Sequence, residues 1–310
     1  MRRVLPAGIL LTAVAASAAS ARDIPWSEPP LRDGDVEVFH VGRQRGWGED
    51  VLARVAKVRA RISDRLGGAA AGPVRVLLAP DDAAFAALVG ADRGEWADGV
   101  ARPEERTLIL RPGSPDPALL AHEVAHLVLG EAERSGKEPF PRWFHEGVAQ
   151  WVSGAGLFRA PEELHLAFAS RRVIPLEILT VTFPEGEAPL RLAYEESLSV
   201  VRHLADRWGG EAPGRIVRGV AAGRTFDDAL RETIGLTPTE LDAVWQKANR
   251  PGWIAAAWAF LTRLGLWGML GLASFLIWFV VRAREREKLE LMKAEEEGEN
   301  RIPPTGQAVG

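Results

Sequence analysis

The chain has 310 residues, a formal net charge of −4 and no cysteine. The absence of cysteine excludes disulfide bonds and thiol chemistry, and the negative charge argues against nucleic acid as a partner. Once both ends are set aside, residues 22–252 remain, which is enough for one two-lobed domain.

The first 21 residues are expected to be a signal peptide. Arg2 and Arg3 precede an apolar stretch over residues 4–16, and Ala19-Ser20-Ala21 offers a cleavage site. The domain that follows is therefore expected outside the cytoplasm, in a bacterial periplasm or on the outer face of the cell.

Strands and helices alternate in the first half of this domain. The predicted strands are residues 36–41, 74–78, 96–101 and 107–110, the last two paired as a hairpin. The predicted helices are residues 50–66, ended by Gly67 and Gly68, and a shorter one that is capped by Asp81 or Asp82 and ends at Val89. From Pro141 onward only helices are predicted. The expected fold is therefore α+β, a small mixed sheet lobe followed by an all-helical lobe.

A helix that begins at Asp116-Pro117 carries the most informative motif, His122-Glu123-Val124-Ala125-His126. Asp116 is suited to the N-cap and Pro117 to the first helical position, and Gly130 is the expected stop. Histidines four residues apart leave the same face of a helix, so both can bind one metal ion. Two histidines and a glutamate among apolar side chains are costly to bury without such a partner.

A second helix, which begins near Pro141, is expected to supply a third ligand. Catalytic zinc takes three protein ligands and leaves one position open for water. Glu146 would face inward and complete the set with His122 and His126. His145 is the alternative, although it points about 100° away around the helix. We favour Glu146 and expect His145 to lie behind a ligand or at the surface.

These two segments resemble the gluzincin metallopeptidases, specifically the small peptidase-MA-like group. The resemblance is carried by His122-Glu123-x-x-His126 and by Pro141-Arg142-Trp143-Phe144-His145-Glu146-Gly147-Val148-Ala149, and it extends from about residue 72 to Trp245. A metzincin is excluded, because the positions that would need glycine and histidine hold Leu129 and Ala132.

The resemblance implies a peptidase that depends on one Zn²⁺ and acts on a peptide or protein substrate. Its zinc cleft would lie between the sheet lobe and the helical lobe. Glu123 would be the general base that acts on the zinc-activated water. In this group the strand just before the zinc helix pairs with the substrate backbone. The sequence leaves residues 99–102 and 107–110 open as that strand.

The resemblance also implies an oxyanion donor from the helical lobe, either a tyrosine or a histidine. Tyr194 is the only tyrosine in the chain, and His203 lies nine residues later on the same predicted helix, so the two face opposite ways. Tyr194 shares its face with Leu198, Val201, Ala205 and Trp208, whereas Glu196, Ser199, Asp206 and Arg207 share that of His203. We therefore expect Tyr194 to face inward as the donor, with an ordinary core tyrosine as the alternative, and His203 to face solvent.

Residues 264–281 predict a single C-terminal transmembrane helix. The run is apolar and uncharged, and Trp267 and Trp278 lie near its ends. Four basic residues follow, Arg282, Arg284, Arg286 and Lys288. By the positive-inside rule they place residues 282–310 in the cytoplasm as a charged tail. The expected form is a single-pass membrane protein with an extracytoplasmic catalytic domain.

Three functions remain open at this point. The leading one is a membrane-anchored zinc peptidase. The second is a non-catalytic pseudo-peptidase that binds peptide or cell-wall components in the same cleft, although such a binder has no need of Glu123. The third is a zinc hydrolase that acts on a non-peptide amide or ester.

Overall fold

The computed structural model describes residues 24–67, 72–90, 97–113, 116–136, 138–154 and 161–250, together with residues 265, 268, 270–282 and 284–285. The described residues fall into two compact units. The first contains those up to Leu164 and Arg172–Asn249, and the second contains His165–Arg171 and those from Arg250 onward. The sheet and the candidate site belong to the first unit.

A mixed five-stranded sheet opens the first unit. Its strands are β1 (Leu31–Asp33), β2 (Val36–Phe39), β3 (Val74–Leu78), β4 (Gly99–Arg102) and β5 (Thr107–Leu110). They lie in the order β1-β2-β3-β5-β4, with β2, β3 and β5 parallel and the two outer strands antiparallel to their neighbours. The predicted hairpin is confirmed, and β4 is one edge of the sheet while β5 is internal.

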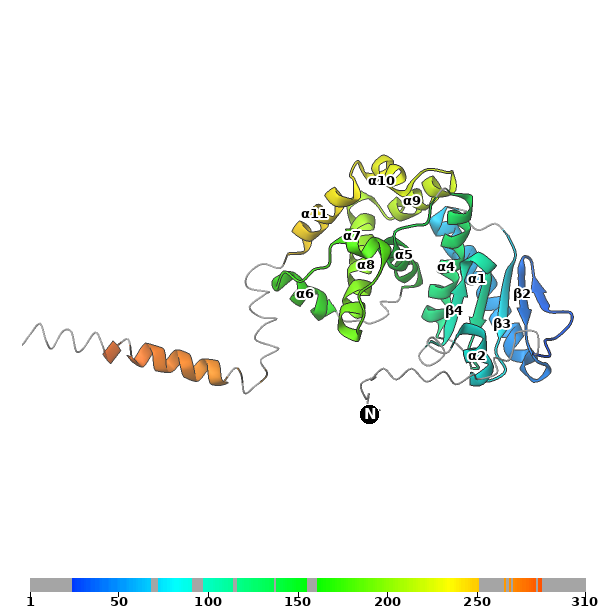
Figure 1. Cartoon of the computed structure of the whole chain (residues 1–310), viewed down its shortest axis with the longest axis horizontal. Coiled ribbons are helices and arrows are strands. Elements are labelled where there is room, and N and C mark those ends of the chain that lie inside the picture. The colour runs from blue at the N-terminus through cyan, green and yellow to red at the C-terminus, as the bar shows by residue number, and fades with distance from the viewer. Residues whose placement is uncertain are drawn as a thin grey trace, which may run out of the picture. The chain divides into compact units, whose positions relative to one another are not determined.

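Helices make up the rest of the fold. They are α1 (Arg45–Leu66), α2 (Asp82–Val89), α4 (Pro117–Ser135), α5 (Arg142–Ser153), α6 (Pro161–Ala169), α7 (Leu176–Val181), α8 (Glu187–Trp208), α9 (Ala212–Ala221), α10 (Phe226–Ile234) and α11 (Pro238–Asn249), with 3-10 turns η2 (Gly42–Gln44) and η3 (Pro103–Glu105). Among the described residues after Pro141 every element is helical, so the predicted α+β class is confirmed (Figure 1).

Alternation along the strands gives the sheet two apolar faces. On one face, Val100 and Ile109 pack with Phe85 of α2. On the other face, Gly99 is paired with Leu110, and a Cβ at Gly99 would lie 3.0 Å from the side chain of Leu110 and 3.6 Å from that of Glu123, which places α4 on that side. Helix α1 packs against both α4 and β2. The motif helix is thereby held over the β4 edge of the sheet.

The motif helix is longer than predicted. The Asp116 side chain accepts a hydrogen bond from the N–H of Ala118 at 2.7 Å, and Pro117 takes the first position, as expected. The predicted stop at Gly130 is wrong, because α4 continues to Ser135. A Cβ at Gly130 would collide with Pro103 of η3. The glycine therefore makes room for the hairpin turn.

The two predicted end segments are described only in part. Residues 1–21, the predicted signal peptide, and most of the tail 282–310 lie outside the described residues. Within the predicted span 264–281, residues 270–281 are helical. Among the residues that the structure describes, no helix is both long enough and apolar enough to cross a membrane.

A buried carboxylate lies in the helical part. Glu196 of α8 is fully buried, although its face of the helix predicted solvent. Its two oxygens accept the N–H of Ile174 at 3.0 and 3.2 Å, and Asp242 accepts the N–H of Leu176 at 3.3 Å. Burial raises the pKa of Glu196 to about 8, and the charge of Asp242 acts in the same direction.

This shift makes stability depend on pH. Between pH 4.5, the ordinary pKa, and about 8, Glu196 holds a proton in the folded state and loses it in the unfolded state. Stability therefore falls as pH rises through this interval. We expect Glu196→Gln to raise the melting temperature at pH 8 by about 4 °C or more, with a much smaller change at pH 5. Thermal unfolding followed by circular dichroism measures both changes, with Glu177→Gln, at an exposed position of α7, as the control. Equal shifts at the two pH values would contradict the assignment.

Candidate metal centre

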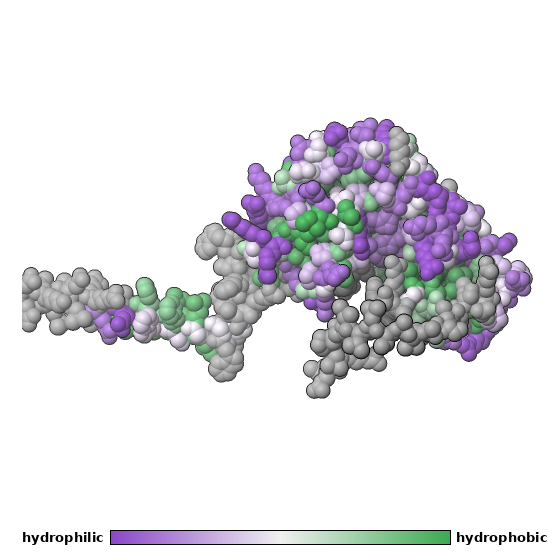
Figure 2. All heavy atoms as spheres, viewed as in Figure 1, coloured by the Kyte–Doolittle hydropathy of each residue, from purple (hydrophilic) through white to green (hydrophobic). Residues whose placement is uncertain are grey.

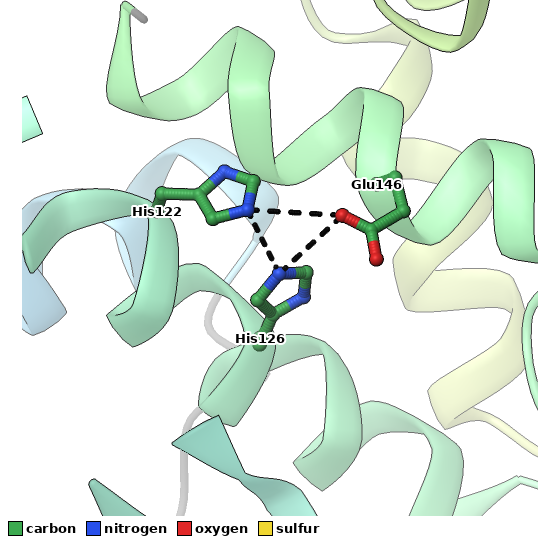
Figure 3. Close-up of side chains that lie close together, drawn as sticks. All are labelled: His122, His126 and Glu146. Carbon is green, nitrogen blue, oxygen red and sulfur yellow. Dashed lines mark hydrogen bonds and ion pairs between the residues drawn. The ribbon is translucent and has the colours of Figure 1, made fainter. Parts of the chain in front are cut away.

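Two helices bring the predicted ligands together. Helix α4 presents His122 and His126 one turn apart, and α5 packs against α4 so that Glu146 points at both (Figure 3). The Nε2 atoms of the two histidines lie 3.0 Å apart. Oε2 of Glu146 lies 3.7 Å from Nε2 of His122 and 3.6 Å from Nε2 of His126. The three donor atoms form a compact triangle.

This triangle fits a zinc-type ion. Bonds of about 2.0–2.2 Å in a tetrahedral arrangement separate the ligand atoms by roughly 3.3–3.6 Å. Two imidazole nitrogens and a carboxylate oxygen are donors that zinc commonly takes. Oε2 of Glu146 is also buried without a hydrogen-bond partner among the described residues. A cation between the three atoms would satisfy that oxygen.

Burial sets the charge of the three side chains. It lowers the pKa of His122 to about 3, with His126 adding to the effect, and the pKa of His126 to about 4. Both imidazoles are therefore neutral near pH 7, which is the form that binds metal. Burial raises the pKa of Glu146, and His122 and Arg142 oppose this rise. The donor set lacks positive charge of its own.

His145 lies behind the donor triangle. Its Nδ1 is 2.9 Å from Nδ1 of His126, and the two rings are stacked with centroids 4.8 Å apart. It thus contacts the side of His126 opposite the triangle. Its Nε2 lies 3.9 Å from Oε1 of Glu133, which accepts the N–H of Phe140 at 2.8 Å. Of the two residues predicted as the third ligand, Glu146 lies near the Nε2 atoms of both histidines, whereas His145 contacts the far side of the His126 ring.

Glu123, the predicted general base, points to the edge of the sheet. Its Oε2 accepts the N–H of Ala101 in β4 at 2.8 Å. Ala101 is in register with Leu108 of β5, but its N–H is turned away from β5 towards Glu123. The side of β4 on which the described residues provide no neighbouring strand therefore faces Glu123.

Tyr194 also lies at the site. Burial raises its pKa, the charges of Glu146 and Glu123 act in the same direction, and Arg142 opposes them. The hydroxyl therefore keeps its proton near pH 7. The apolar neighbours predicted for its face, Leu198, Val201 and Ala205, are buried, as expected. His203 instead packs edge-on against Trp208, with ring centroids 5.8 Å apart.

Sequence reasoning missed Arg142, which lies one turn before Glu146 on α5. Its guanidinium carbon is 4.6 Å from the centre of the Phe183 ring, and it donates a hydrogen bond to Tyr194. The available signal was its spacing of four residues from Glu146, which puts both side chains on one face of the helix. Phe183 could not be found in this way, because it reaches the site from the loop after α7.

A glycine fixes the distance between α5 and α8. A Cβ on Gly147 would collide with the carbonyl oxygen of Ser197 and lie 2.7 Å from Val201. One turn later, the side chain of Gln150 donates to the carbonyl of Tyr194 at 2.9 Å. This close approach holds the helix that carries Glu146 against the helix that carries Tyr194.

We expect Gly147→Ala to lower the free energy of unfolding by about 1–3 kcal/mol, because α8 must shift to admit the methyl group. Thermal unfolding measures this loss as a lower melting temperature. Gly46→Ala is the matched control, since a Cβ at that helical glycine would meet nothing within 4 Å. The same melting temperature for both variants would be inconsistent with the tight contact.

Comparison with known proteins bears on the same part of the chain. The family model of the Peptidase MA superfamily matches residues 57–250, which include α4, α5 and α8. No curated protein matches the chain closely enough to count as a relative. With more than half of its length matched, the chain belongs to the Peptidase MA superfamily.

Proposed function

We propose that this protein is a membrane-anchored, zinc-dependent peptidase that acts outside the cytoplasm. The observation that carries the proposal is the triangle of donor atoms from His122, His126 and Glu146, which lies beside Glu123 and the open edge of β4. Membership of the Peptidase MA superfamily supports the reaction class.

The proposed roles follow from these positions. His122, His126 and Glu146 would hold one zinc ion. When bound, zinc supplies Lewis acidity, which lowers the pKa of a water molecule and polarises a carbonyl. Glu123 would accept the proton of the attacking water and pass it to the leaving amine. Tyr194, still protonated at neutral pH, would donate a hydrogen bond to the oxyanion.

The edge strand supports a peptide as the substrate. An extended peptide can add to an unpaired strand through backbone hydrogen bonds. Of the two strands that the sequence leaves open, β5 has neighbours on both sides, whereas β4 has a strand on one side only among the residues that the structure describes. The other side of β4 faces Glu123 through Ala101. We therefore assign Gly99–Arg102 as the strand that would align the scissile bond with the base.

Glu123 also favours catalysis over binding alone. A pseudo-peptidase needs neither a carboxylate beside the metal nor one held at the substrate edge. The β4 edge, in turn, favours a peptide over a non-peptide amide or ester, because a peptide has the backbone groups that pair with a strand.

Metal binding and turnover should separate in two variants of the full-length protein. Glu123→Gln should keep about one zinc per chain, because it removes no ligand. Its rate of cleavage of a randomised peptide pool should fall about 10³-fold, because the base is lost. Glu146→Ala should lose zinc as well, because it removes one of three ligands. Mass spectrometry measures zinc, and chromatography of the peptides measures cleavage.

His145→Ala belongs in the same series and should weaken zinc affinity by about 10-fold to 100-fold without abolishing it, since His145 orients His126. Full cleavage by Glu123→Gln would refute the proposed mechanism. Zinc bound to the wild-type protein without any cleavage would indicate the pseudo-peptidase.

The membrane anchor is proposed from residues 264–281. Within it, residues 270–281 are helical, and their large apolar side chains are exposed, for example Phe275 at 58% and Ile277 at 65%. Figure 2 shows hydrophobic residues on the surface of this helix. Such exposure of consecutive apolar side chains is costly in water and favourable in lipid.

We expect the full-length protein, expressed in a bacterium, to stay with the membrane pellet after an alkaline carbonate wash, because the apolar run is buried in lipid. Removal of residues 264–310 should release the protein into the soluble fraction. Immunoblotting of the two fractions measures the distribution. Full-length protein that the wash releases would rule out a spanning anchor.

A further inference from the structure

Arg142 places an exposed cation at the candidate site. It projects from the first turn of α5, one turn before Glu146, on an exposed position. None of the ion pairs formed by the described residues includes Arg142. Its charge is therefore not neutralised by a contacting carboxylate in the described part of the chain.

The guanidinium is held between two neighbours, the Phe183 ring and Tyr194. Its carbon lies 4.6 Å from the centre of the buried Phe183 ring, and that ring meets Tyr194 edge-on, with centroids 5.1 Å apart. This cation–π contact occupies one side of the guanidinium, and Tyr194 takes one of its hydrogen bonds. A guanidinium has five N–H groups, so others remain as donors for a ligand. A planar fork of donors that is fixed in this way suits two-point recognition of a carboxylate.

The charges at the site favour an anion at this position. Glu123 and Glu146 contribute two negative charges when ionised, and a bound divalent ion offsets both. The positive charge of Arg142 then remains. An anionic group of the substrate would meet a positively charged rim next to the donor triangle.

We propose that Arg142 is a specificity-determining residue that binds a carboxylate of the peptide substrate, with Phe183 fixing its guanidinium. This inference rests on the proposed function, because it assigns a substrate class to the same site. The carboxylate can be the C-terminus of the peptide or an acidic side chain. The chemistry of recognition is the same for both, and the experiment distinguishes them.

The structure offers a second role for Arg142, since it also contacts Tyr194. An arginine that served only to orient Tyr194 would affect all substrates alike. An arginine that binds a substrate carboxylate affects only the peptides that carry one. The test therefore compares matched peptides and does not rely on activity.

The experiment measures peptide binding by full-length protein that carries Glu123→Gln, with zinc added, so that bound peptides stay intact. Three pools of randomised octapeptides with an N-terminal fluorophore are titrated by fluorescence anisotropy. One pool has only neutral side chains and an amidated C-terminus, the second has the free C-terminal carboxylate instead, and the third is amidated but contains glutamate. Each pool is measured with Arg142, Arg142→Gln and Arg142→Lys.

We expect one carboxylate pool to bind about tenfold more tightly than the neutral pool, as a charged hydrogen bond predicts. Arg142→Gln should abolish this ratio and leave the neutral pool within about twofold, whereas Arg142→Lys should keep part of the ratio because it retains the charge. Tighter binding of the second pool would identify the C-terminus as the ligand, and of the third an acidic side chain. Arg61→Gln, at an exposed position of α1, should change nothing.

Three results would overturn the proposal. The first is that all pools bind with the same affinity or that none binds. The second is that the affinity ratio between a carboxylate pool and the neutral pool survives Arg142→Gln, and the third is that Arg142→Gln weakens the binding of every pool equally. Failure of the proposed function is read separately. It would appear as absence of zinc, or as absence of peptide cleavage by protein with Glu123 intact, while the binding of the three pools could still be measured.

Discussion

Three electron-rich atoms, Nε2 of His122, Nε2 of His126 and Oε2 of Glu146, lie 3.0–3.7 Å from one another. Burial keeps both imidazoles neutral, so neither histidine brings a positive charge to the carboxylate. Lone pairs and negative charge that converge away from water are unfavourable unless a cation joins them. Other contacts must therefore hold the triangle in place, and the packing around α4 and α5 provides them.

Aromatic packing locks the connection between these two helices. Phe140, just before α5, lies against Phe144 and Phe226, and Trp143 also packs on Phe226. Hydrogen bonds fix the same region, because Glu133 accepts the N–H of Phe140 and Glu138 accepts that of Phe226 at 2.9 Å. The start of α5 is thus tied to α4 and to α10. The part of α5 that carries Glu146 therefore cannot move away from the histidines without disturbing this cluster.

Much of this arrangement could be predicted from the sequence, for identifiable reasons. The motif spacing predicted that His122 and His126 share a face, and periodicity predicted that Tyr194 turns inward. Both are properties of a single helix. The sequence could not choose between β4 and β5 as the edge, because strand order is set by long-range pairing. The stop expected at Gly130 and the solvent face expected for Glu196 are wrong for a similar reason. Neighbouring elements cover both positions, and the periodicity of one helix does not show which elements pack against it.

Helix α5 explains why the site tolerates so little displacement. Within six consecutive residues it gives Arg142 and Glu146 to the site, Trp143 and Phe144 to the aromatic cluster, His145 to the reverse side of His126, and Gly147 to the contact with α8. Successive side chains are rotated by about 100°, so each partner occupies its own sector around the helix. A shift of one residue would put an aromatic ring against the histidines and a side chain against Ser197. Packing and chemistry are therefore fixed by the same register. Arg142 lies in the sector of Glu146, which is why a residue that no motif singles out is brought next to the metal ligands.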